Sequence, residues 1–70
     1  MADKPKLHLS ARQHQIFNII VTRGLTNKQI GQMLNITDST VKIHVGIILK
    51  RFGLQSRSQL IIHKDDYEII

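Results

Sequence analysis

The 70-residue chain has no cysteine, and this absence excludes several chemistries at once. Without thiols there can be no disulfide, no thiolate metal site and no cysteine nucleophile, and the composition fits a reducing compartment. No apolar run approaches the length that spans a bilayer, and no signal-peptide apolar region follows the first residues. We therefore expect a soluble, cytoplasmic protein that forms one small domain.

Acidic residues are also scarce: 5 Asp and Glu stand against 10 Lys and Arg, which gives a formal net charge of +5. Three of the five acids, Asp65, Asp66 and Glu68, lie in the last six residues, so the rest of the chain is more basic than the total suggests. This balance favours a polyanionic partner, although it also fits a surface that is charged only for solubility.

Capping signals and apolar spacing predict four helices and no strand, so the expected fold class is all-α. The first, second and fourth helices each begin with Ser or Thr followed three residues later by Gln, which is a capping box. Thr37 caps the third helix, and Gly24 and Gly53 are natural stops. The expected helices are about 10–23, 26–34, 37–52 and 56–62.

The same pattern divides the chain into a flexible N-terminal arm (1–8), a four-helix bundle-like domain (9–64) and an acidic C-terminal tail (65–70). The tail contains Tyr67, Ile69 and Ile70, which can fold back on the domain.

The second and third helices are joined only by Asn35 and Ile36, and such a short turn is typical of a helix-turn-helix. This geometry leaves the third helix free to project its outer face into the major groove of DNA. Sequence-specific DNA binding is therefore the leading functional hypothesis.

Five motifs, in this order, resemble the LuxR-type (LuxR/FixJ/NarL) helix-turn-helix domain, and the similarity covers Leu9 to about His63. The resemblance implies a DNA-binding effector domain of a bacterial transcription regulator, whose third helix enters the major groove and whose fourth helix commonly mediates dimerisation. The motifs are Leu9-Ser10-x-Arg12, Gly24-Leu25-Thr26-Asn27-Lys28-Gln29-Ile30, Ile36-Thr37-Asp38-Ser39-Thr40-Val41-Lys42-x-His44, Arg51-Phe52-Gly53-Leu54 and Ser56-Arg57.

The apolar row of the third helix predicts which side of that helix meets the bases. Opposite this row lie our base-contacting candidates, Ser39, Lys42, Ile43 and Gly46. Lys42 can donate to O6 and N7 of guanine, and Ile43 fits contact with a thymine methyl group. The resemblance implies base contacts at Lys42 and Ile43 too. The alternative makes Lys42 a solvated lysine and Ile43 part of the core edge.

Other residues are candidates for phosphate contact, which positions a domain without identifying bases. Asn27 and Lys28 lie in the first turn of the second helix, where backbone amides and a flexible cation can meet a phosphate. Thr40 can contact a phosphate through its hydroxyl group. The weaker phosphate candidates, for which we favour a structural role, are Lys50, Arg51 and Arg57.

The chain departs from the family at four positions. Gln13 and Gln15 stand where members usually carry glutamate, so any ion pair there is weakened or replaced by a neutral hydrogen bond. Gly46 occupies a position where some members have a base-contacting lysine, so either the backbone approaches DNA closely or one contact is lost. Gly31 replaces the usual alanine and still provides a small residue where the second and third helices cross.

Leu60, Ile61 and Ile62 are three consecutive apolar residues, and one helix cannot turn all of them toward one core. We expect Ile61 and Ile62 to form a weak homodimer interface on double-stranded DNA, over an inverted or direct repeat. Such a regulator contacts RNA polymerase or occludes it. In the alternative hypothesis the domain uses Ile43, Ile47 and the fourth helix to dock another protein without binding DNA.

The four histidines show no spacing that suggests a metal or catalytic site. We expect no cofactor, no small-molecule ligand and no enzymatic activity, because nothing places a nucleophile beside a base. His44 falls at core-side spacing and is expected to be a hydrogen-bonded packing residue.

Overall fold

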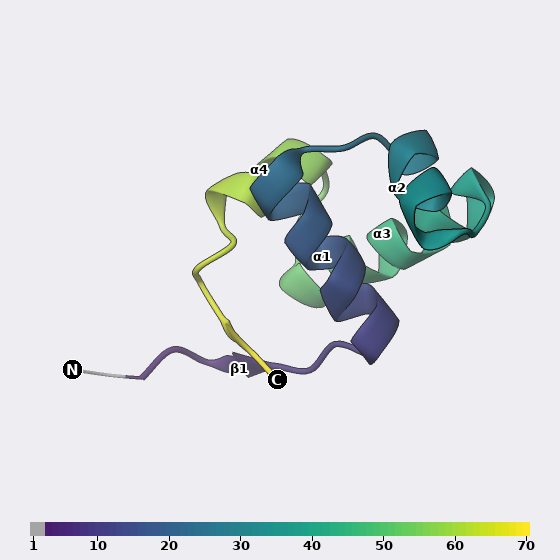
Figure 1. Ribbon diagram of the computed structural model, residues 1–70. Helices are drawn as coiled ribbons and strands as arrows, with labels where there is room; N and C mark the ends of the chain where they lie inside the picture. The colour runs from purple at the N-terminus through teal and green to yellow at the C-terminus, as the bar shows by residue number, and fades with distance from the viewer. Residues whose placement is uncertain (1–2) are drawn as a thin grey trace.

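Four helices form most of the computed structural model, which describes residues 3–70 (Figure 1). Two strands of two residues each lie near the ends of the chain. None of the helices in residues 3–70 is long and apolar enough to cross a membrane. The elements are β1 (Lys6–Leu7), α1 (Ala11–Arg23), α2 (Asn27–Leu34), α3 (Asp38–Phe52), α4 (Arg57–Ile62) and β2 (Glu68–Ile69).

The first two helices begin with the capping boxes that the sequence predicts. Ser10 Oγ accepts a hydrogen bond from the backbone N–H of Gln13 at 3.2 Å, and Gln13 Oε1 accepts one from the Ser10 N–H at 3.1 Å. Thr26 and Gln29 repeat this arrangement at 3.2 and 2.9 Å. Each box satisfies two backbone donors that a helix N-terminus would otherwise leave free.

The third and fourth helices also begin where they are predicted. Thr37 Oγ1 accepts from the Thr40 N–H at 3.1 Å, and α3 ends at Gly53, whose φ of 69° is left-handed. At the start of α4, Gln59 Oε1 accepts from the Ser56 N–H at 3.2 Å. The four predicted helices are therefore confirmed.

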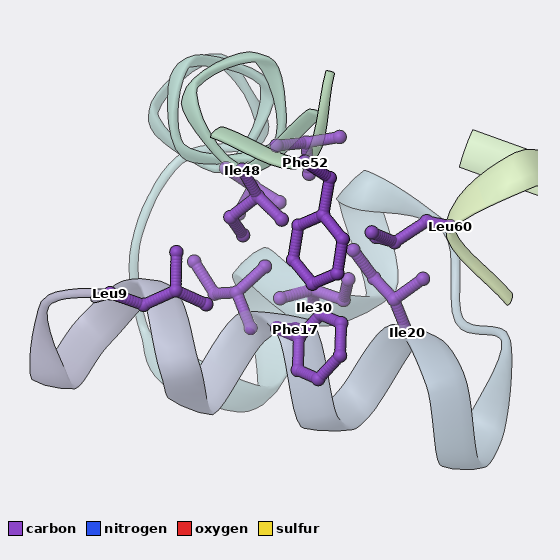
Figure 2. Close-up of a cluster of buried hydrophobic side chains, with 10 residues drawn as sticks. Leu9, Phe17, Ile20, Ile30, Ile48, Phe52 and Leu60 are labelled. Carbon is purple, nitrogen blue, oxygen red and sulfur yellow. The ribbon is translucent and has the colours of Figure 1, made fainter. Parts of the chain in front are cut away.

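The core lies between α1 and α3, and side chains from α2 and α4 complete it (Figure 2). The rings of Phe17 and Phe52 stack at its centre, with their centroids 5.3 Å apart. Ile30 from α2 and Leu60 from α4 are fully buried against them. The buried core residues are Leu9, Ile16, Phe17, Ile20, Ile30, Val41, Val45, Ile48, Phe52 and Leu60.

The turn between α2 and α3 holds the two helices very close together. Asn35 ends α2 in the left-handed conformation (φ 58°), and the Ile36 N–H donates to the Gly31 carbonyl oxygen at 2.9 Å. A Cβ atom on Gly31 would lie only 2.6 Å from the Ile36 carbonyl oxygen. In this chain even alanine would force the turn to shift, which explains the glycine.

The sequence predicts no strand, and the structure shows that this expectation is wrong. β1 and β2 pair in parallel, with the Glu68 N–H donating to the Pro5 carbonyl at 2.9 Å and the Ile70 N–H to the Leu7 carbonyl at 3.0 Å. Tyr67 packs edge-on against the Phe52 ring, with centroids 5.3 Å apart. The all-α class stands, because each strand has only two residues.

The predicted arm and tail are thus joined to each other along residues 5–9 and 68–70, while residues 1 and 2 of the arm lie outside the described residues. Tyr67 and Ile69 fold back onto the core as expected, whereas Ile70 stays 53% exposed.

Candidate nucleic-acid interface

The four base-contacting candidates all lie on the exposed side of α3. Ser39, Lys42 and Gly46 are exposed, and Ile43 is 64% exposed. The alternative placement of Ile43 at the core edge is therefore wrong. A Cβ atom on Gly46 would meet no atom within 4 Å, so this glycine leaves open space on the same face.

The basic side chains are not neutralised within the protein. In residues 3–70, none of the ten Lys and Arg side chains forms an ion pair with a carboxylate, and the one carboxylate contact of this kind joins His63 Nδ1 to Asp66 Oδ2 at 2.8 Å. Arg12 donates from its guanidinium group to the amide oxygen of Gln15 at 3.3 Å, so at this position, where the family usually has glutamate, no ion pair forms. The cations remain available to a polyanion.

Asn27 and Lys28 stand at the start of α2 as predicted, and the structure adds a third participant. The guanidinium group of Arg57 donates to Asn27 Oδ1 and to the Leu25 carbonyl oxygen. The structural role that we favoured for Arg57 is confirmed, and its partial burial lowers the pKa of this guanidinium below the ordinary value. With its oxygen held by Arg57, Asn27 has its amide NH2 group left to donate, and the Lys28 side chain is exposed.

Thr40 and Lys50 differ in how much of their hydrogen-bonding capacity is used within the protein. The Thr40 hydroxyl lies 2.9 Å from Thr37 Oγ1, so part of its hydrogen-bonding capacity is used at the helix cap. Lys50 is exposed in the last turn of α3 and has no carboxylate partner within residues 3–70, so its ammonium group stays a candidate for phosphate contact. Its neighbour Arg51 donates to the His8 carbonyl oxygen at 3.5 Å, which supports the structural role that we favoured for Arg51.

The fourth helix exposes two of its three consecutive apolar residues. Leu60 is fully buried, whereas Ile61 is 43% and Ile62 75% exposed. The prediction that at least one of them lies outside the core is confirmed. These two isoleucines form a small apolar surface for which residues 3–70 provide no cover.

One expectation about the histidines is wrong. His44 is half-buried on α3, as its spacing predicts, but its buried Nδ1 has no hydrogen-bond partner among the described residues. Spacing along a helix identifies the side of a residue, but a hydrogen-bond partner must come from another part of the chain. Residues 3–70 contain no group of three or more His, Cys, Asp or Glu that could hold a metal ion, and no pocket.

Met33 follows Ile30 by three residues, a spacing that predicts the apolar side of α2, but it does not lie in the core. Met33 is 45% exposed, because the packed side of α2 is formed by Ile30 and Gly31, both buried against α3. Gly31 was the available signal: a glycine that replaces a larger residue where helices cross marks the close-packed side, and Met33 lies away from it.

Comparison with known proteins gives the family. A family model described as "Bacterial regulatory proteins, luxR family" matches residues 7–64. The chain belongs to this family. NarL of Escherichia coli (strain K12), a nitrate/nitrite response regulator protein, is 47% identical over 49 residues, which are 70% of this chain and 22% of NarL.

Other relatives of the luxR-family domain come from different bacteria. The response regulator protein VraR of Staphylococcus aureus (strain NCTC 8325 / PS 47) is 32% identical over 62 residues, 89% of this chain and 29% of VraR. The two-component response regulator PprB of Pseudomonas aeruginosa is 42% identical over 52 residues, 74% of this chain and 18% of PprB. The chain thus spans less than a third of the length of these curated relatives.

Membership in the luxR family establishes the general class of this domain. It is a helix-turn-helix domain of the kind that binds DNA in transcription regulators, and the family is one of regulators rather than of enzymes. The predicted family, fold class and DNA-binding class are therefore confirmed.

Proposed function

We propose that this luxR-family domain binds DNA sequence-specifically by placing α3 in the major groove, with Lys42, Ile43, Ser39 and Gly46 toward the base edges. The observation that supports this most directly is the outward face of α3, where Ile43 is 64% exposed beside the unpaired Lys42. Lys42 donates to guanine O6 and N7, and Ile43 contacts a thymine methyl group.

Phosphate contacts hold the domain in register on the duplex. In this proposal the Asn27 amide and the Lys28 ammonium group bind one phosphate at the start of α2, where backbone amides and the helix dipole favour an anion. Thr40 and Lys50 contact the backbone from the two ends of α3. Arg57 supports this arrangement indirectly, because its hydrogen bond fixes the orientation of the Asn27 side chain.

Two copies associate weakly through α4 when they occupy neighbouring half-sites. Ile61 and Ile62 supply the contact, since they are the exposed apolar residues of that helix. Paired copies then alter transcription by contacting RNA polymerase or by occluding it, in the cytoplasm of the bacterium where its DNA lies.

The central test compares Lys42→Ala on a selected target duplex and on a scrambled duplex of equal length. Loss of one base contact should weaken specific binding by about 1–3 kcal/mol and affect scrambled DNA much less. Lys6→Ala is the charge-matched control, because Lys6 is exposed on β1, away from the start of α3 (Figure 1). Equal losses on both duplexes for Lys42→Ala would remove its base-reading role.

The competing function is a protein-docking module that uses Ile43, Ile47 and the apolar surface of α4, all of which are exposed. The salt dependence of binding affinity distinguishes the two functions. Phosphate contacts release counterions, so the affinity for DNA should fall steeply as salt rises, whereas an apolar docking interface should respond little. Binding of duplex DNA that is insensitive to salt, or absent at low salt, would favour the docking module.

A further inference from the structure

A second isoleucine accompanies Ile43 on the outward face of α3. Ile47 lies one turn further along the helix and is 36% exposed, against 64% for Ile43. Gly46, on the same face, has no side chain to cover either of them, and its surroundings are open. The pair is therefore accessible to anything that lies against this helix.

The position of the pair follows from helix geometry. At about 100° per residue, Ile43 points away from the side formed by Val45 and Ile48, which are buried, and Ile47 is turned by about 40° from Ile43. The two residues are separated by about 6 Å along the helix axis. In DNA a base pair rises about 3.4 Å, so the pair spans roughly two base-pair steps when α3 follows the groove.

The surroundings of the pair indicate what covers it. Exposed lysines flank it on the same helix, Lys42 before and Lys50 after, and neither has a carboxylate partner within residues 3–70. A partner must therefore offer negative charge at its edges and apolar groups at its centre. The major groove does so, with phosphates along its rims and thymine 5-methyl groups on its floor.

The same face lacks the groups that recognise the other bases. It carries no Asn or Gln to form the paired hydrogen bonds with adenine, and the one carboxylate of α3, Asp38, is turned by about 140° from Ile43. Lys42 is its one cation in the first two turns, available for guanine. Between Lys42 and Lys50, the exposed side chains of α3 are those of Ile43 and Ile47.

We propose that Ile43 and Ile47 each contact a thymine methyl group, so that the target half-site contains two thymines no more than about two base pairs apart, next to the guanine read by Lys42. This inference rests on the proposed function and adds to it. Ile47 becomes a specificity-determining residue, and the preferred DNA is defined by methyl groups more than by hydrogen bonds.

The experiment begins with selection of a target by the full 70-residue chain from a library of random duplexes. Each thymine of the selected half-site is then replaced in turn by deoxyuridine, which removes only the 5-methyl group and keeps base pairing. Binding is measured at one fixed salt concentration. We expect two positions at which the loss of the methyl group weakens binding about fourfold, as the burial of one methyl group predicts.

Variants then assign each methyl group to a side chain. Ile43→Ala should abolish the uracil effect at one position and Ile47→Ala at the other. Once the isoleucine that contacts a methyl group has been truncated, removal of that methyl group should cost no further affinity. Ile70→Ala, which truncates another exposed isoleucine far along the chain from α3, should leave both effects intact.

Two different failures can be told apart. If a target is selected but deoxyuridine never weakens binding, or Ile47→Ala keeps both uracil effects, the methyl-reading role is refuted while sequence-specific binding stands. If no sequence is enriched from the library, the proposed function fails, and the inference fails with it.

Discussion

Gly46 offers a test in which stability and DNA binding are measured on the same variant. It lies inside α3 with ordinary helical backbone, and an added Cβ atom would meet nothing within 4 Å. Replacing a glycine in such an exposed helix interior by alanine should stabilise the fold by about 1 kcal/mol. For a domain of this size that corresponds to a rise in Tm of about 4–8 °C.

The assay is thermal unfolding followed by helical circular dichroism, with two other glycines as matched controls. Gly53→Ala should lower Tm, since the φ of 69° at this helix end disfavours any side chain. Gly31→Ala should lower it as well, because the new Cβ atom would lie 2.6 Å from the Ile36 carbonyl oxygen. The same glycine-to-alanine change should thus raise Tm at position 46 and lower it at positions 31 and 53.

Gly46→Lys extends the test to DNA. The lysine should stabilise the helix nearly as much as alanine does and should add a cation to the face of α3, so affinity should rise with Tm. A more stable variant that binds DNA more weakly would show that the backbone at Gly46 approaches the DNA closely. A fall in Tm for Gly46→Ala would refute the structural reasoning itself.

Three further predictions concern the rest of the interface. Lys28→Ala should weaken specific and scrambled binding alike and reduce the salt slope by about one, which titrations at several salt concentrations measure. An unchanged slope would remove Lys28 from the phosphate contacts. Ile62→Asp should abolish cooperative occupancy of paired half-sites, measured by gel shift; lost helical circular dichroism would instead mean that Ile62 belongs to the core. Arg57→Ala should destabilise the domain by about 1–2 kcal/mol in urea unfolding, since two hydrogen bonds to a charged group are lost. A smaller loss of unfolding free energy for Arg57→Ala than for Arg51→Ala would contradict this expectation.

The helices could be predicted because their signals are local. Each cap pairs residues three apart in sequence, such as Ser10 with Gln13, and the glycines at helix ends need only a left-handed backbone. Exposure on α3 and α4 followed from spacing in the same way: Ile43 and Ile62 are both outside the core.

What the sequence did not reveal depends on contacts between distant residues. Arg57 bonds to residues 30 and 32 positions away, and no pattern in the chain points to them. The pairing of β1 with β2 joins opposite ends of the chain, and two residues are too few for the alternation that identifies a strand. The unpartnered Nδ1 of His44 likewise depends on which groups surround it, and spacing does not determine that.

The hydrogen bonds of Arg57 have a consequence for the spacing of DNA sites. They connect α4, where we place the dimer contact, to Leu25 and Asn27 at the start of the helix-turn-helix. Two copies joined through α4 would then hold their α3 helices at a fixed separation. No hinge between α4 and the helix-turn-helix would let this separation adjust to a different spacing of the half-sites. Inserting five base pairs between half-sites, half a turn of the duplex, should therefore abolish cooperativity, and inserting about ten should not restore it fully.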